Sequence, residues 1–175
     1  MKRSLISMAL AWIVACSAED MPQNMEAPVQ GETTCESGVY WSLGTTGSPL
    51  MNPGLACRSC HQQQAPEMAY YFSGTVFPSL HESNLCNSNP PHGARVEILD
   101  ADGNVTLTLI PNAVGNFLST SVVAGVPLPY RARLVVHESV RIMTTPQTNG
   151  DCNSCHTEQG TQGAPGRIVW PDHLE

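Results

Sequence analysis

The chain is poor in charged residues and almost devoid of lysine. Charged side chains make up 13% of its 175 residues, and the formal net charge is −7. Lys2 is the only lysine, and seven arginines stand against fifteen aspartates and glutamates. Nucleic-acid binding needs a basic face that neutralises phosphates, so this composition argues against a nucleic-acid partner.

Long apolar runs are also missing, apart from residues 4–14 near the N-terminus, which are too few to span a bilayer. A short basic start before an apolar run is typical of a signal peptide. The following Ile13-Val14-Ala15-Cys16 resembles the lipobox of bacterial lipoproteins. The resemblance implies that residues 1–15 are removed and that Cys16 is acylated, and Ser17 fits the outer-membrane sorting pattern. In the alternative, an ordinary secretory peptide, Cys16 has no special role.

One five-residue pattern occurs twice, as Cys-Arg-Ser-Cys-His at residues 57–61 and as Cys-Asn-Ser-Cys-His at residues 152–156. C-x-x-C-H is the attachment signature of c-type haem. Two thiols three residues apart add to the two vinyl groups of one haem, and the adjoining histidine ligates the iron. The chain therefore resembles c-type cytochromes at these two motifs. The resemblance implies two covalent haems, attached through Cys57 and Cys60 and through Cys152 and Cys155, with His61 and His156 as axial ligands.

The remaining cysteines fit this scheme. Of the seven cysteines, one is assigned to lipid and four to haem, which leaves Cys35 and Cys86. Two leftover thiols outside the cytoplasm usually pair, so we predict a Cys35–Cys86 disulfide. Two free buried thiols are the alternative.

The second motif cannot take its sixth iron ligand from a downstream methionine, because no methionine follows His156. A low-spin electron-transfer haem takes a second axial ligand, usually Met or His. Met51 and Met143 precede the two motifs, each in a Met, Pro, Gly lead-in, and are our candidates. Both can instead be core fillers, which is the common use of methionine. The rival ligands are His137, the best placed of the four, and His81, His92 and His173.

Residues 70–143 show the alternation of β-strands. Apolar residues recur at every second position in residues 70–76, 94–98, 105–109 and 130–136, and Asp-Ala-Asp-Gly-Asn at residues 100–104 predicts a hairpin turn. We expect a mainly β chain with a small Ig-like β-sandwich. The segments 72–76, 93–103, 115–117 and 130–136 resemble the carboxypeptidase-regulatory or transthyretin-like β-sandwiches. In those families the module usually serves as scaffold or docking surface.

The expected organisation follows from these assignments. Residues 1–15 are the signal peptide, residues 16–34 a flexible tether, residues 35–69 and 144–175 the two irregular, partly helical haem-binding segments, and residues 70–143 the sandwich. A short helix is expected at about residues 55–64, ending before Pro66.

We therefore expect an electron-transferring, lipid-anchored dihaem cytochrome at the bacterial outer membrane, a carrier rather than an enzyme. Processing leaves six arginines against fifteen acidic residues, so a redox partner is expected to present a basic docking face. Two alternatives remain open. The four motif cysteines can form a zinc site that clips the sandwich, or the chain is a haem peroxidase-type enzyme that uses His137 or Glu138.

Overall fold

The computed structural model describes residues 34–171, and every structural statement below concerns these residues. The predicted signal peptide, all but the last residue of the predicted tether, Cys16 and His173 lie outside them. The elements in chain order are α1 (Cys57–Gln64), the 3-10 turn η2 (Pro66–Met68), β1 (Ser73–Phe77), β2 (Arg95–Leu99), β3 (Val105–Leu109), β4 (Asn116–Leu118), β5 (Arg131–Val136), β6 (Ser139–Ile142), the 3-10 turn η3 (Cys152–Ser154) and β7 (Ile168–Val169).

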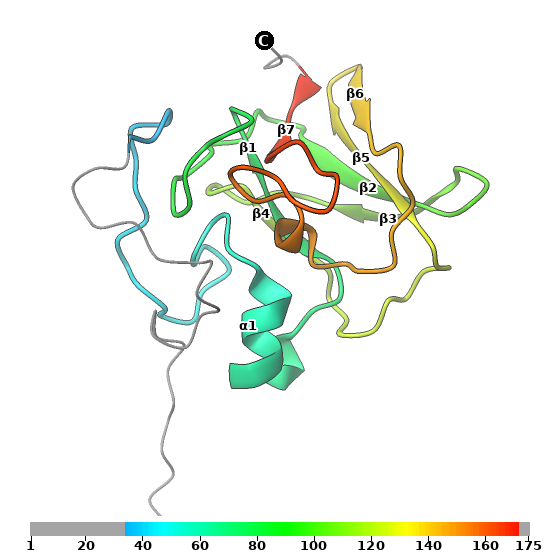
Figure 1. Cartoon of the computed structure of the whole chain (residues 1–175), viewed down its shortest axis with the longest axis horizontal. Helices are drawn as coiled ribbons and strands as arrows, with labels where there is room; N and C mark the ends of the chain where they lie inside the picture. Colours follow the sequence, from blue (N-terminus) through cyan, green and yellow to red (C-terminus); the bar gives the residue numbers. More distant parts are fainter. Residues whose placement is uncertain (1–33, 172–175) are drawn as a thin grey trace, which may run out of the picture.

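The strands form two sheets, as Figure 1 shows. One has the order β4-β1-β7 and the other the order β3-β2-β5-β6. The architecture is mainly β, with a single α-helix among the described residues. Both the mainly β class and the hairpin at residues 100–104 are as predicted, since β2 and β3 pair antiparallel across that turn.

The core lies between the sheets because alternate residues of each strand turn inward. On β2 these are Val96 and Ile98, which pair with Leu134 and Ala132 of β5. All four are buried. The main cluster comprises Phe72, Val76, Ala94, Val96, Ile98, Leu109, Phe117, Tyr130, Ala132, Leu134, Val136 and Trp170. Burial of these apolar side chains is the main stabilising contribution to the fold.

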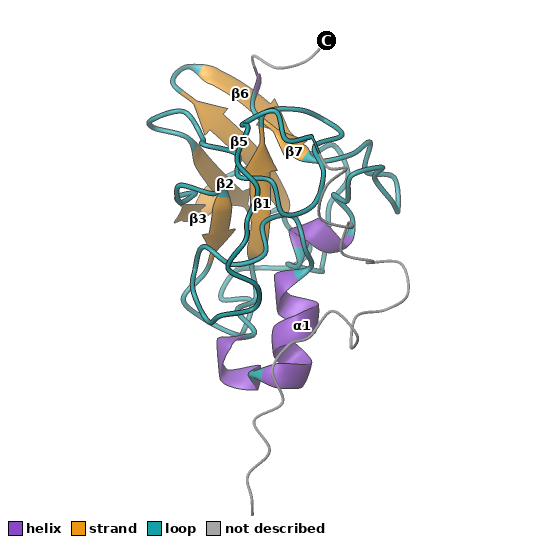
Figure 2. Ribbon diagram, turned by 90° about the vertical axis from the view of Figure 1, so that its left-hand side faces the viewer, coloured by secondary structure: helices purple, strands orange, loops and turns teal. Residues whose placement is uncertain are grey.

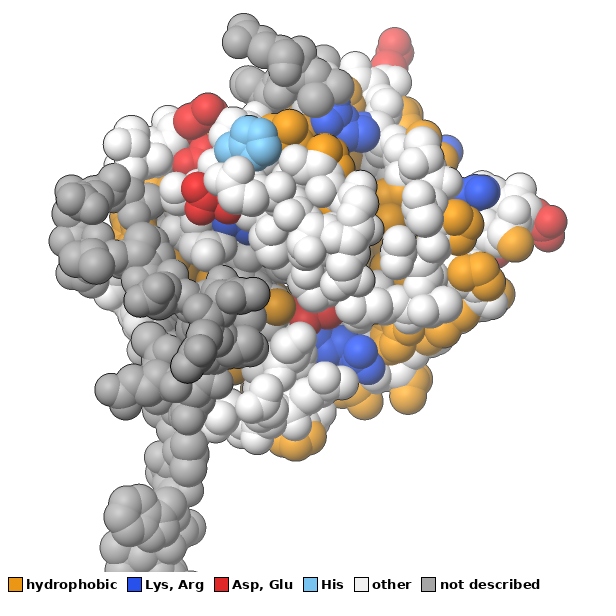
Figure 3. All heavy atoms as spheres, in the orientation of Figure 1, with side chains coloured by type: hydrophobic (Ala, Val, Ile, Leu, Met, Phe, Trp, Pro, Cys, Tyr) orange, Lys and Arg blue, Asp and Glu red, His pale blue; other side chains and the backbone are white. Residues whose placement is uncertain are grey.

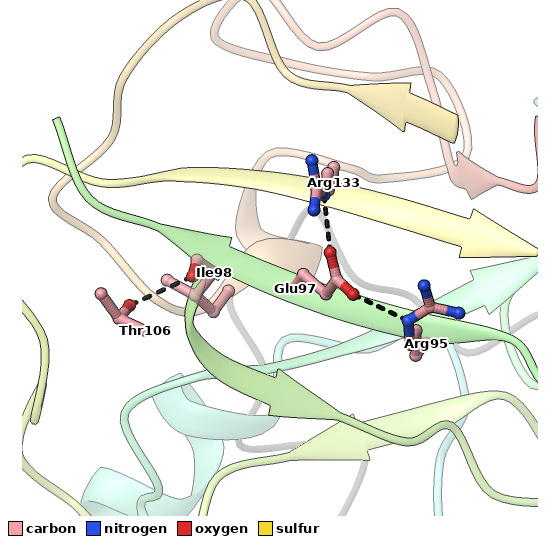
Figure 4. A network of polar contacts seen from close by, with 5 residues as sticks. All are labelled: Arg95, Glu97, Ile98, Thr106 and Arg133. Carbon is pink, nitrogen blue, oxygen red and sulfur yellow. Dashed lines mark hydrogen bonds and ion pairs between the residues drawn. The ribbon is translucent and has the colours of Figure 1, made fainter. Parts of the chain in front are cut away.

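The outer face of the four-stranded sheet carries a three-residue charge cluster. Glu97 accepts hydrogen bonds from Nε of Arg95 at 2.7 Å and from Nε of Arg133 at 2.6 Å, as Figure 4 shows. Burial alone would raise the pKa of Glu97, but the two guanidinium groups outweigh it, so the pKa lies below its usual value. Glu97 thus stays ionised, and its carboxylate is the hydrogen-bond acceptor of Nε in Arg133.

The three-stranded sheet is covered on both faces, which explains why β1 does not alternate in exposure. All five residues of β1 are buried. Its inner face packs on the core, while the stretches around the two C-x-x-C-H motifs cover the outer face through Thr75. In addition, β7 pairs parallel with β1, through Val76 opposite Ile168. Residues 168–169 therefore complete a sheet, although the sequence placed them in the second haem-binding segment, outside the sandwich.

The flanking segments are only partly helical. The helix expected at about residues 55–64 corresponds to α1, and Figure 2 shows it at one end of the sandwich. The second flank contains one 3-10 turn, η3, and is otherwise irregular up to β7. Gly, Pro, Thr and Asn between residues 144 and 166 explain this, because they favour turns over long helices.

The predicted Cys35–Cys86 disulfide is present. It joins residues 51 positions apart and packs with Phe77 and Val169 in a buried cluster. The bond ties the segment before the first motif to the loop that follows β1.

Removing this disulfide should weaken the fold. In the double variant C35S/C86S we expect a loss of about 3–4 kcal/mol in the free energy of unfolding, because a loop of this length gains entropy in the unfolded chain. Urea unfolding followed by tryptophan fluorescence measures it. The single variant C35S should lose a similar amount, since either change opens the loop. A double variant with the wild-type midpoint would contradict the structural role.

Candidate functional site

The two C-x-x-C-H motifs meet on the outer face of β1, where Thr75 joins them. The Thr75 hydroxyl accepts hydrogen bonds from the Gly54 amide at 2.9 Å and from Nδ2 of Asn153 at 3.0 Å, and donates to Oδ1 of Asn116 at 2.8 Å. Nδ2 of Asn153 also donates to the Leu55 carbonyl at 2.9 Å. Asn153 lies inside the second motif, and Gly54 and Leu55 precede the first. We call this group of hydrogen bonds the Thr75 network.

Asp151 makes a second, direct connection between the motifs. Its Oδ2 accepts from the Ser59 amide at 2.9 Å and from the Ser59 hydroxyl at 2.8 Å. Its carbonyl accepts from the hydroxyl of Ser154, the matching serine of the second motif, at 2.6 Å. The carboxyl group is buried, and desolvation raises its pKa despite these hydrogen bonds. Figure 1 shows the turn of the second motif, η3, directly above α1.

Both motif histidines are held in the same way. Nδ1 of His61 lies 2.9 Å from the Met68 carbonyl, and Nδ1 of His156 lies 2.9 Å from the Gly166 carbonyl. A carbonyl can only accept, so each Nδ1 carries the proton and each Nε2 keeps its lone pair when the ring is neutral. Burial lowers the pKa of His156, which favours that neutral form. This is the usual arrangement of a metal-ligating histidine, whose second nitrogen is fixed by a hydrogen bond.

A cavity of about 310 Å³ opens beside the second motif. Cys152, Cys155 and His156 line it, and so does Met143. The cavity lies between the two sheets, and its other walls include core residues of β2, β4 and β5 and residues of β6 and β7. Its size falls within the range of about 300–1,000 Å³ that is common for small-molecule and cofactor sites.

The first motif has a different setting. Cys57, Cys60 and His61 are half-buried on α1, a helix without a buried residue. Arg58 of this motif stacks on the ring of Tyr71, 4.7 Å from its centroid. Cys60 is disulfide-bonded, whereas Cys57, Cys152 and Cys155 are free thiols.

Two of the free thiols are strongly protonated in this form of the chain. Burial, reinforced by the nearby charge of Asp151, raises the pKa of Cys57 and that of Cys152 to about 12. A thiol rather than a thiolate is a weak nucleophile and a weak metal ligand. At neutral pH these two sulfurs therefore favour the protonated thiol form.

The structure separates the candidates for the sixth iron ligand. Met143 packs against the core and faces the same cavity as Cys152 and His156. Met51 instead packs against the small cluster of Trp41, Leu55 and Leu85, as a core filler does.

The histidine rivals lie elsewhere. His137 is exposed in the turn between β5 and β6 and does not line the cavity. His81 is also exposed, with Nδ1 2.8 Å from the Glu158 carbonyl, and His92 is exposed in a loop.

The four motif cysteines are not gathered as zinc ligands. Among residues 34–171, the single group of three metal-ligand atoms within 4.8 Å of one another comes from Cys35, Glu82 and Cys86. Two of these sulfurs form the disulfide, so they are not available as thiolates.

Sequence patterns did not reveal the residues that hold the site together. Thr75, Asn153 and Asp151 act through buried hydrogen bonds that join residues far apart in the chain. Arg141 and Tyr130, which line the cavity, read in the sequence as ordinary strand residues. One weak signal was available, since both motifs carry serine immediately before the second cysteine, and both serines bind Asp151.

The surface around the site carries little charge. Figure 3, which has the orientation of Figure 1, shows mostly backbone and uncharged side chains over the second flank, with a few charged groups between them. Within residues 34–171, no helix has the length and apolar character needed to cross a membrane.

Comparison of the chain with protein-family models, with curated proteins and with solved structures found no match.

The Thr75 network predicts a large effect from a small change. In T75V, the shape is kept, but the Gly54 amide and Nδ2 of Asn153 each lose a buried acceptor. We expect a loss of about 2–4 kcal/mol in the free energy of unfolding, since each unsatisfied buried group costs about 1–3 kcal/mol. T108V makes the same replacement at an exposed position of β3 and should change stability by less than about 0.5 kcal/mol. Equal urea midpoints for the two variants would show that the network contributes nothing.

Proposed function

We propose that this chain is a dihaem c-type cytochrome that transfers electrons at the bacterial cell envelope. Cys57 and Cys60 hold one haem and Cys152 and Cys155 the other. His61 and His156 are the proximal iron ligands, and a lipid on Cys16 anchors the chain to the outer membrane.

A single observation carries the proposal: one cavity brings together the two thiols and the histidine of the second motif with Met143. A haem at this site needs two thiols for its vinyl groups, one nitrogen ligand and a second axial ligand. The residues that could supply all of these line the same apolar opening between the sheets. The matching hydrogen bonds of Nδ1 in His61 and His156 support the proposal independently, because they leave Nε2 of each ring for iron.

The bound haem would supply an iron that cycles between its ferrous and ferric states. Residues of the chain orient the iron ligand, set its protonation state and line the cavity. The Gly166 carbonyl orients the ring of His156, and burial keeps that ring neutral. Buried core side chains of the two sheets, among them Phe117 and Leu134, form an apolar part of the cavity wall.

The first motif requires one further step. The Cys60 sulfur is disulfide-bonded in this structure, so haem attachment there first needs an external dithiol, which reduces the bond by thiol–disulfide exchange and is itself oxidised to a disulfide. Once formed, the first site is held against the second by Ser59 and Asp151. Direct contact between the two motifs would favour electron transfer from one haem to the other. We propose that the Thr75 network maintains this contact.

The net charge of the chain indicates what kind of redox partner it would bind. The chain without its signal peptide has an excess of acidic residues, so a redox protein with a basic docking face is the partner we propose. Such an association should weaken as salt is added.

Two other functions use the same residues. A zinc site would need the motif sulfurs drawn together, whereas among residues 34–171 they form no group of three or more ligand atoms within 4.8 Å of one another. A haem peroxidase would need an open sixth position and an acid–base group beside it, but Met143 faces that cavity and His137 does not.

The proposal predicts the haem content of three forms of the full-length chain, each produced together with a haem-maturation system. Pyridine haemochrome spectra should show two haems per chain in the wild type, and one in each of the variants C57A/C60A and C152A/C155A. Elemental analysis for zinc is the companion measurement. A wild-type chain with stoichiometric zinc and no haem band would refute the cytochrome and favour the zinc site.

The cavity also predicts the sixth ligand of the second haem. In M143L, the ferric protein should lose the weak far-red charge-transfer band of a Met–iron bond, because leucine keeps the volume without the thioether sulfur. M51L is the matched control and should keep that band, since Met51 packs against Trp41 and Leu55. Loss of the band in M51L and not in M143L would reverse the assignment.

A further inference from the structure

The cavity beside the second motif is more basic than the chain as a whole. Three arginines line it, namely Arg133, Arg141 and Arg167, while Asp151 is the one carboxylate among its lining residues. The chain overall carries a formal charge of −7. An apolar cavity with an unpaired cation at its wall favours a ligand that has both an apolar body and a negative group.

Two of these arginines are already occupied. Arg167 is buried and donates to four oxygens: Nε to the Glu82 carbonyl, Nη1 to the carbonyls of Gly54 and His156, and Nη2 to Oδ1 of Asn84. Arg133 is paired through Nε with Glu97 on the outer face of the sheet, as Figure 4 shows.

Arg141 differs from both. It lies on β6 opposite Leu134, and therefore on the side of the sheet that faces the core. Its Nη2 is shielded from solvent and has no hydrogen-bond partner. A buried donor without an acceptor is costly, and for a charged group the cost is larger.

We propose that Arg141 binds a carboxylate of the ligand that fills this cavity. The inference rests on the proposed function, under which the carboxylate is a propionate of the haem at the second motif. Haem has the required character, with an apolar ring and two carboxylates at one edge. Arg141 is then a positioning residue that would hold a propionate of the haem, and its positive charge would stabilise the reduced iron relative to the oxidised iron.

The test compares R141Q with R131Q in the full-length holoprotein. Arg131 lies on the outer face of the same sheet, and it does not line the cavity. R131Q therefore removes one positive charge from the same sheet but outside the cavity. In R141Q, one of the two reduction waves should move to lower potential, while R131Q should overlay the wild type. R141K, which keeps the charge, should restore most of the shift. Superimposable titrations of R141Q and wild type would overturn the inference.

A second measurement does not depend on covalent haem. The full-length chain, produced without haem, is titrated with mesoporphyrin IX and with its dimethyl ester, and quenching of tryptophan fluorescence reports binding. The free acid should bind roughly tenfold more tightly than the ester in wild type and in R131Q, because a charged hydrogen bond is gained. R141Q should bind the two alike. A wild-type chain that does not discriminate between them refutes the role of Arg141, whereas absence of covalent haem refutes the cytochrome.

Discussion

The hydrogen bonds around Thr75 are the constraint on which the rest of this structure depends. One hydroxyl group uses its whole capacity, accepting from Gly54 and Asn153 and donating to Asn116. The backbone amide of Thr75 adds a further bond to Oδ1 of Asn153 at 3.0 Å. Because all of these groups are removed from water, each needs its partner, and the cost of losing one is large. The network thus fixes three parts of the chain to one strand.

That constraint has a consequence for function. The two motif segments come before and after the sandwich in sequence, yet they share a buried surface on β1. Asp151 reinforces the contact by binding Ser59 directly. The sandwich is therefore the support on which two cofactor sites would meet. The two sites are unequal: the second borders a cavity between the sheets, and the first lies on a helix without a buried residue. Different burial would give the two haems different potentials.

The sequence allowed part of this to be predicted. Alternation marked the inward faces of β2 and β5, for example Val96 with Leu134, and turn residues marked the hairpin between β2 and β3. Cysteine counting predicted the Cys35–Cys86 disulfide. Strand alternation and turn residues are local features of the sequence, and the disulfide followed from the number of cysteines. Neither kind of prediction requires knowledge of the tertiary packing.

The remaining features depend on contacts between distant segments. β1 is buried on both faces, so the pattern of apolar and polar residues along it does not reveal that the two motif segments cover Thr75. β7 has two residues, which is too short for any periodicity. Arg141 looks like an ordinary edge-strand cation, and only the register of β6 with β5 places it beside the cavity. The difference between Met51 and Met143 likewise appears only in their packing.

The most direct test of the central claim is the mass of the full-length chain after maturation with haem, measured under denaturing conditions. A dihaem cytochrome should retain two haems through denaturation, since thioether bonds are covalent. After proteolysis, the added mass should lie on the peptides that contain residues 57–61 and 152–156. A chain that loses all haem on denaturation, or that shows no added mass, would contradict the account.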